Sequence, residues 1–103
     1  MQSIEIKKVF AFCAVCETLS FTDAAKSLGL TQSTISHHIS SFEKDVGIHL
    51  FKRTSRSVEL TPEGQKVYLY AKKIFEACKD FESFIAGTAH LSPAWERSTR
   101  RVG

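Results

Sequence analysis

The chain has 103 residues, 43% of them hydrophobic, and a formal net charge of +3. This length allows one small domain, and this composition excludes a disordered chain. The mild basicity fits a polyanionic partner without establishing one, since many other proteins are equally basic. No apolar run approaches the ~18 residues of a membrane span, and the start MQSIEIKKVF lacks a secretory signal pattern. We therefore expect a cytoplasmic protein with no membrane partner.

Residues 4–18 are predicted to form the first helix, with an apolar stripe facing the rest of the domain. Cys13 and Cys16 form a C-x-x-C pair in this helix, which could indicate redox chemistry or a metal site. Their spacing equals that of the stripe, and no second ligand pair follows. Free cysteine behaves as a small hydrophobe, so core packing is favoured. The odd total of three cysteines indicates a reducing compartment, and we expect no metal and no cofactor.

A helix-turn-helix pattern follows at about residues 21–40. Thr22 is predicted to cap the first of these helices, and Thr31 the second. Between them, Gly29 supplies the left-handed backbone of a sharp helix exit. The first helix has a short apolar face formed by Ala24, Ala25 and Leu28.

The second helix of the pair, which Gly47 is expected to end, has two contrasting faces. Residues three or four apart give it a buried stripe of Ile35, Ile39, Phe42 and Val46. Its opposite face carries the side chains predicted to read DNA bases: Gln32, Ser33, Ser36 and His37. Hydroxyls expected to contact the DNA backbone belong to Thr22, Thr31 and Thr34. The alternative is a surface helical hairpin with a polar outer face, but the small alanines, turn glycine and two caps together favour DNA binding.

Residues 50–61 are predicted to form a β-hairpin, because Val58 and Leu60 alternate with polar residues and 54–57 is a polar turn. Positions 50–58 contain three basic residues and no acid. Beside a helix-turn-helix, such a hairpin is a wing, whose arginines can reach phosphates or a narrow minor groove. The predicted backbone contacts are Lys52, Arg53 and Thr54, and the predicted minor-groove contacts are Ser55 and Arg56. An ordinary solvated basic loop is the alternative.

The segment Thr61-Pro62-Glu63 is a strong helix start, and Gly87 is expected to end the helix that follows. An apolar seam at heptad spacing consists of Val67, Ala71, Ile74, Cys78, Phe81 and Ile85, widened by Tyr70, Ala77 and Phe84. A helix of about 25 residues is about 37 Å long, longer than so small a globule can cover. We therefore expect a homodimer through this helix. The alternative is one amphipathic helix packed on its own domain.

The motifs SFTDAAKSLGLTQSTISHHI and GIHLFKRTSRSVELTPEG resemble the DNA-binding domain of LysR-type bacterial transcription regulators, over about residues 4–87. The resemblance implies a mainly α winged helix-turn-helix: a three-helix core, a small β-hairpin wing and a long dimerising linker helix. It also places Gln32, Ser33, Ser36 and His37 at base-reading positions, and Arg53 and Arg56 in the wing. Ser33 stands where many members have proline, and His37 where many have arginine. Histidine cannot make the bidentate guanine contact of arginine, which leaves the base preference open.

We divide the chain into a DNA-binding domain at 1–61, a linker helix at 62–87 and a hinge or flexible tail at 88–103. The end Arg100-Arg101-Val102-Gly103 resembles the opening of an effector domain. The chain is thus a longer regulator cut at its hinge or a stand-alone binder with a basic tail. In either case we expect the effector domain to be absent, and with it any small-molecule inducer.

Enzyme chemistry finds no support in the sequence, which lacks a glycine-rich phosphate loop and a nucleophile elbow. The histidines at 37, 38, 49 and 90 lack metal-site spacing. We expect the partner to be double-stranded DNA at the nucleoid, with an inverted-repeat operator. The competing hypothesis is a protein-interaction module. Binding to random duplex at low salt, with strong salt dependence, would separate the two.

Overall fold

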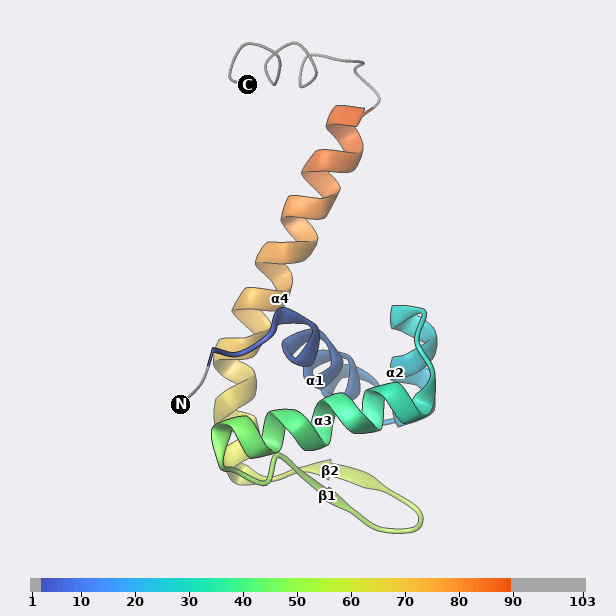
Figure 1. The fold of residues 1–103 in the computed structure, drawn as a ribbon, viewed down its shortest axis with the longest axis vertical. Coiled ribbons are helices and arrows are strands. Elements are labelled where there is room, and N and C mark those ends of the chain that lie inside the picture. The colour runs from blue at the N-terminus through green and yellow to red at the C-terminus, as the bar shows by residue number, and fades with distance from the viewer. Residues whose placement is uncertain (1–2, 90–103) are drawn as a thin grey trace.

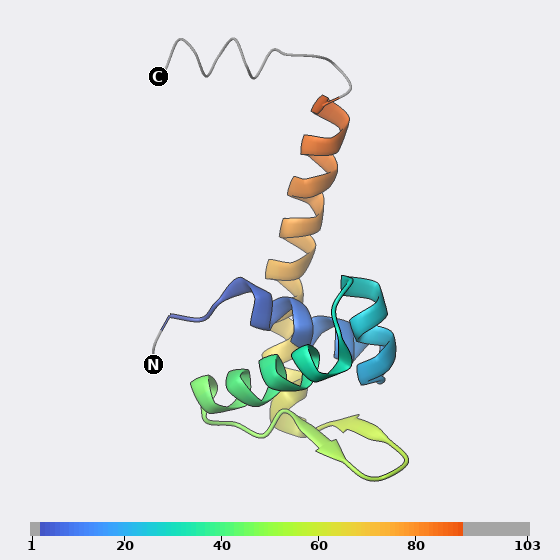
Figure 2. The same cartoon turned by 45° about the vertical axis from the view of Figure 1, so that its right-hand side comes forward.

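The structure, a computed structural model, describes residues 3–89 of the chain. It confirms the winged helix-turn-helix architecture (Figure 1). The helices are α1 (Ile6–Thr18), α2 (Phe21–Leu28), α3 (Gln32–Val46) and α4 (Pro62–Ala89), and the hairpin consists of β1 (Phe51–Arg53) and β2 (Val58–Leu60). In both views α4 extends far beyond the other elements (Figure 2). The expected tail after Ala89, with His90 and the final Arg100-Arg101-Val102-Gly103, lies outside the described residues.

The core is built around α1, which packs against α2, α3 and α4. Phe12 is fully buried at its centre. The ring centroids of Phe42, Phe51 and Tyr68, from three other elements, lie 5.4, 5.5 and 6.2 Å from that of Phe12. Aromatic pairs at these separations add packing energy beyond the buried area. One ring of α1 therefore joins α3, the wing and α4.

Core packing is confirmed for the C-x-x-C pair: Cys13 is fully buried and Cys16 partly buried. Burial raises the pKa of the Cys13 thiol to about 12 and also raises the pKa of Cys16. Both side chains are therefore protonated thiols, which are poor nucleophiles and poor metal ligands. Within residues 3–89, no group of three or more His, Cys, Asp or Glu side chains is placed to hold a metal ion.

Most predicted helix ends are confirmed. Gly29 and Gly47 follow α2 and α3 in the left-handed region, with φ of 67° and 70°. Thr31 caps α3 by accepting the amide hydrogen of Thr34 at 3.1 Å. The predicted cap of α2 is wrong, because that helix begins at Phe21 and Thr22 lies inside its first turn. Ser20 is the cap, and its hydroxyl accepts the amide hydrogen of Asp23 at 3.0 Å.

The wing is joined to α4 through the backbone of Leu50. Its carbonyl accepts the amide hydrogen of Thr61 at 3.0 Å, just before α4 begins. The Thr61 hydroxyl donates to the carbonyl of His49 at 2.6 Å and accepts the amide hydrogen of Gly64 at 2.9 Å, which caps α4. Gly64 lies so close to this junction that a Cβ atom there would be 2.3 Å from the Leu50 carbonyl oxygen.

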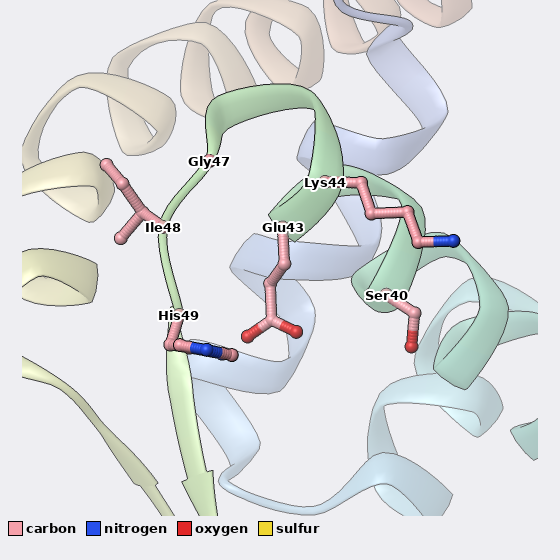
Figure 3. Close-up of a pocket in the computed structure, with 6 residues that line it drawn as sticks. All are labelled: Ser40, Glu43, Lys44, Gly47, Ile48 and His49. Carbon is pink, nitrogen blue, oxygen red and sulfur yellow. The ribbon is translucent and has the colours of Figure 1, made fainter.

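The wing is also joined to α3, through Glu43. One carboxylate oxygen of Glu43 accepts the amide hydrogens of Leu50 and Phe51, at 2.8 and 3.3 Å. Glu43 points toward the segment that leads into β1, beside a cavity of about 340 Å³ (Figure 3). Because Phe51 is the first residue of β1, this carboxylate fixes the start of the wing against α3.

The apolar seam of α4 divides into two stripes. Val67 and Ala71, with the unpredicted Phe75, pack on the chain's own core, and Cys78 is partly buried. The ring of Phe75 meets that of Phe10 edge-on at 5.0 Å. A second stripe remains exposed and consists of Tyr70, Ile74, Phe81, Phe84 and Ile85. Val67 and Ala71 therefore serve the domain's own core, whereas the second stripe leaves large apolar side chains uncovered.

The predicted helix end at Gly87 is wrong, since α4 continues to Ala89. A glycine inside a helix costs only about 1 kcal/mol relative to alanine, so the neighbouring turns carry the helix through it. The hydroxyl of Thr88 donates to the carbonyl of Phe84 at 2.9 Å. Across the described residues, no helix combines the length and the apolar character needed to cross a membrane.

Gly64→Ala should lower the free energy of unfolding by about 1–3 kcal/mol, because the new methyl group overpacks the junction at Leu50. Gly87→Ala is the matched control, since its Cβ meets nothing within 4 Å and alanine favours a helix. Urea denaturation followed by circular dichroism measures both. Equal stability of the two variants would contradict the proposed contact at Gly64.

Candidate nucleic-acid interface

The first turn of α3 and the tip of the wing lie at the same end of the molecule (Figure 1). An open cleft of about 530 Å³ separates them. The side chains that line it come from α2, α3 and the wing, and include Thr22, Gln32, Ser36, Arg53, Thr54 and Arg56. The structure therefore brings part of the predicted contact set together around one concave surface. The other predicted residues do not line this cleft: Thr31, Ser33, Thr34, His37 and Lys52.

The polar face of α3 lies opposite its buried stripe, as predicted. Gln32, Ser33 and His37 are exposed and Ser36 is partly buried. On the other side, Ile35 and Ile39 are fully buried. The hydroxyl of Thr22 lies 3.3 Å from the amide oxygen of Gln32, which leaves the Gln32 amide hydrogens available to a partner.

The threonines at the start of α3 already have partners within the domain. The Thr31 hydroxyl accepts the amide hydrogen of Thr34 and lies 2.8 Å from the Thr34 hydroxyl and 3.3 Å from that of Ser33. This cluster fixes the first turn of α3. Contact of Thr31 and Thr34 with the DNA backbone stays a prediction, and the structure itself gives Thr31 the role of capping α3.

The tip of the wing is a tight turn closed by Thr54. The Thr54 amide donates to the carbonyl of Ser57 at 2.9 Å, and its hydroxyl accepts the amide hydrogens of Arg56 and Ser57 at 3.3 and 3.0 Å. Thr54 therefore holds the turn, whatever contact it makes with a ligand. The turn leaves the side chains of Ser55 and Arg56 exposed.

The two strands give the basic side chains of the wing different surroundings. The antiparallel register sets Lys52 opposite Glu59 and Arg53 opposite Val58. An acid directly across the hairpin partly offsets the charge of Lys52. The Arg53 guanidinium instead lies over the ring of Phe21 in α2, 4.4 Å from its centroid. The positive charge of the wing is therefore concentrated on Arg53 and Arg56, which border the cleft.

Residues 6–65 match the family described as bacterial regulatory helix-turn-helix protein, lysR family. The match covers more than half of the chain. The chain belongs to the LysR family.

Solved and curated LysR-type proteins agree with this assignment. The glycine cleavage system transcriptional activator of Escherichia coli K12 is 48% identical over 64 residues, which are 62% of this chain and 21% of that protein. The BenM DNA-binding domain in complex with benA site 1 DNA has a TM-score of 0.69 and 38% identity, covering 82% of this chain and 96% of that one. Corynebacterium glutamicum OxyR in its oxidized form has a TM-score of 0.77 and 27% identity, covering 85% of this chain and 27% of that one.

Two neighbouring histidines of α3, His37 and His38, differ in their surroundings. His37 is exposed, and His38 is partly buried with its ring centroid 6.2 Å away. Burial, followed by the nearby Lys7 ammonium, lowers the pKa of His38. His38 therefore remains neutral at neutral pH, and His37 is the member of the pair that a ligand can reach.

Sequence reasoning missed three residues that shape this interface: Ser20, Phe21 and Glu43. Ser20 had a readable signal, because a serine three residues before Asp23 is typical of a helix cap. Phe21 could be assigned to the core from its type, but its contact with Arg53 depends on how the wing folds back on α2. Glu43 carried no signal, since its partners Leu50 and Phe51 are backbone groups beyond the end of its helix.

Proposed function

We propose that this chain binds double-stranded DNA as the DNA-binding part of a LysR-type transcription regulator. In this proposal α3 lies in the major groove and the wing lies on the adjacent backbone and minor groove. The base-reading residues are Gln32, Ser33, Ser36 and His37. Arg53 and Arg56 supply positive charge to the phosphates and the minor groove. The remaining contacts of the wing come from Lys52, Thr54 and Ser55. The residues of the two helices that lie near the DNA backbone are Thr22, Thr31 and Thr34.

The single observation that carries the proposal is the cleft between α3 and the wing. It combines an exposed polar helix face with two arginines that face no acid across the hairpin. Short polar side chains suit base edges, and arginine suits phosphates and narrow minor grooves. The DNA complex of the BenM domain supports the same use of the fold.

The proposed activity is recognition without catalysis, performed in the cytoplasm at the nucleoid and without a cofactor.

The decisive test is titration of the chain against random duplex DNA at several salt concentrations. A DNA-binding domain shifts the duplex with strong salt dependence. A protein-interaction module leaves it unshifted at low salt. Selection from a random pool of duplexes would then give the operator, for which we expect an inverted repeat.

The second part of the proposal is a homodimer through α4. Tyr70, Ile74, Phe81, Phe84 and Ile85 form a stripe of large exposed apolar side chains. Beside it, a groove of about 320 Å³ is lined by apolar residues of α1, α3 and α4. A helix of this length with an uncovered apolar face is typical of helix pairing. A twofold dimer would present two recognition helices to two half-sites.

Arg56→Ala should weaken binding to operator and random DNA alike and lower the salt slope by about one, because one phosphate contact is lost. Lys72→Ala removes the same charge from α4, outside the cleft, and should leave the slope nearly unchanged. Fluorescence anisotropy over a salt series measures both. A large loss confined to the operator, with an unchanged slope, would contradict the assigned role of Arg56.

His37 should make DNA binding sensitive to pH. A phosphate beside an exposed histidine favours the protonated imidazole, so affinity should rise as pH falls from about 8 to about 6. His37→Gln should remove most of this dependence, whereas His38→Gln should keep it, because burial lowers the pKa of His38. His37→Arg should bind more tightly across the whole range. Identical curves for the wild type and His37→Gln would mean that His37 lies idle at the rim.

Phe81→Asp should shift the chain from dimer to monomer, because a charge would be buried in the centre of the helix pair. Ser83→Asp places the same charge on α4 away from the exposed stripe and should leave the dimer intact. Sedimentation of the three proteins decides the matter. A wild-type chain that is monomeric at tens of micromolar would refute the homodimer.

A further inference from the structure

The guanidinium of Arg53 has an aromatic partner and forms no ion pair within residues 3–89. Its central carbon lies 4.4 Å from the centroid of the Phe21 ring. The side chain as a whole is exposed and borders the cleft. The ring face is therefore the contact that orients this cation before any ligand arrives.

The core holds the Phe21 ring in place. Phe21 is 8% exposed and meets the ring of Phe51 edge-on at 6.2 Å. Phe51 in turn packs on Phe12, the ring at the centre of the domain, at 5.5 Å. A chain of aromatic contacts thus runs from the core of the domain to the one arginine that faces the cleft from β1.

The planar shape of guanidinium lets it contact an aromatic ring and an anion at once. When its face lies on a ring, its N–H groups point outward in its own plane. A phosphate is bound by those edge N–H groups, two at a time in the best geometry. A contact of this kind with Phe21 therefore leaves free the donors that a DNA phosphate needs.

We propose that Phe21 is a positioning residue for DNA binding: it holds the Arg53 guanidinium over the cleft, with its edge free for a backbone phosphate. A free arginine side chain loses much rotamer freedom when a ligand fixes it, and an arginine already held by a ring loses less. The inference rests on the proposed DNA-binding function. It assigns a binding role to a residue that otherwise belongs to the apolar core.

A double-mutant cycle on DNA affinity tests this role. Phe21→Leu should weaken binding about two- to five-fold, the factor that corresponds to an exposed cation–π contact. In an Arg53→Ala background the same substitution should have no further effect, because the group that Phe21 positions is gone. Phe21→Tyr keeps the ring and should bind like the wild type.

The matched control is Phe42→Leu, which removes another buried ring, one that packs on Phe12 and has no cation–π contact with Arg53. Its effect should be the same in the wild-type and the Arg53→Ala backgrounds. If Phe21→Leu also weakens binding equally in both backgrounds, Phe21 acts only through the core and the inference is overturned. If the wild-type chain fails to bind DNA at all, the proposed function itself is wrong.

A measurement on the wild-type protein keeps the inference testable if Phe21→Leu does not fold. Protons above the face of an aromatic ring are shifted upfield in the NMR spectrum. The side-chain δ protons of Arg53 should therefore show an upfield shift in the free protein. Random-coil values for these protons would overturn the inference.

Discussion

The backbone of Leu50 determines where the wing lies relative to the recognition helix. Its amide is bound by Glu43 of α3, and its carbonyl is bound by Thr61 just before α4. The Leu50 side chain is fully buried. Three elements therefore meet at one residue, and a helix in the major groove requires the wing at a fixed distance from it. Gly64 is constrained by the same junction, because only a residue without a Cβ fits against that carbonyl.

The two stripes of α4 allow one helix to serve both its own domain and the proposed second copy. Its first half buries Ala71 and Phe75 on the core, where Phe75 meets α1 through Phe10. Farther along, Phe81 and Phe84 are more than half exposed. Any second copy bound to the exposed stripe is thereby fixed relative to the first core. The spacing of two recognition helices then follows from the packing of α4, without a flexible link.

The sequence was sufficient for the elements whose signals are local. Gly29, Gly47, Thr31 and the Thr61-Pro62 start all act within one turn of chain, and the structure confirms them. Prediction from the sequence failed where two local signals compete. Ser20 and Thr22 are both good caps, and only the register of α2 selects Ser20. It also failed where the deciding contact is remote. The contacts of Glu43 with Leu50, and of Arg53 with Phe21, arise only when the wing folds back on the helices. The predicted seam merged two stripes because heptad spacing does not say which neighbour covers each side chain.

The distribution of charge makes the proposed dimer important for the proposed DNA affinity. Lys52 is offset by Glu59, so the arginines of one wing supply few phosphate contacts. Because salt-dependent affinity grows with the number of phosphates neutralised, we expect one such domain to bind DNA weakly. In the proposed dimer, a second domain held through α4 would make the next binding event intramolecular, at a high effective concentration. It does so only when the two half-sites match the spacing that α4 sets. The modest charge in each cleft therefore favours binding to DNA with correctly spaced half-sites over binding to non-specific DNA.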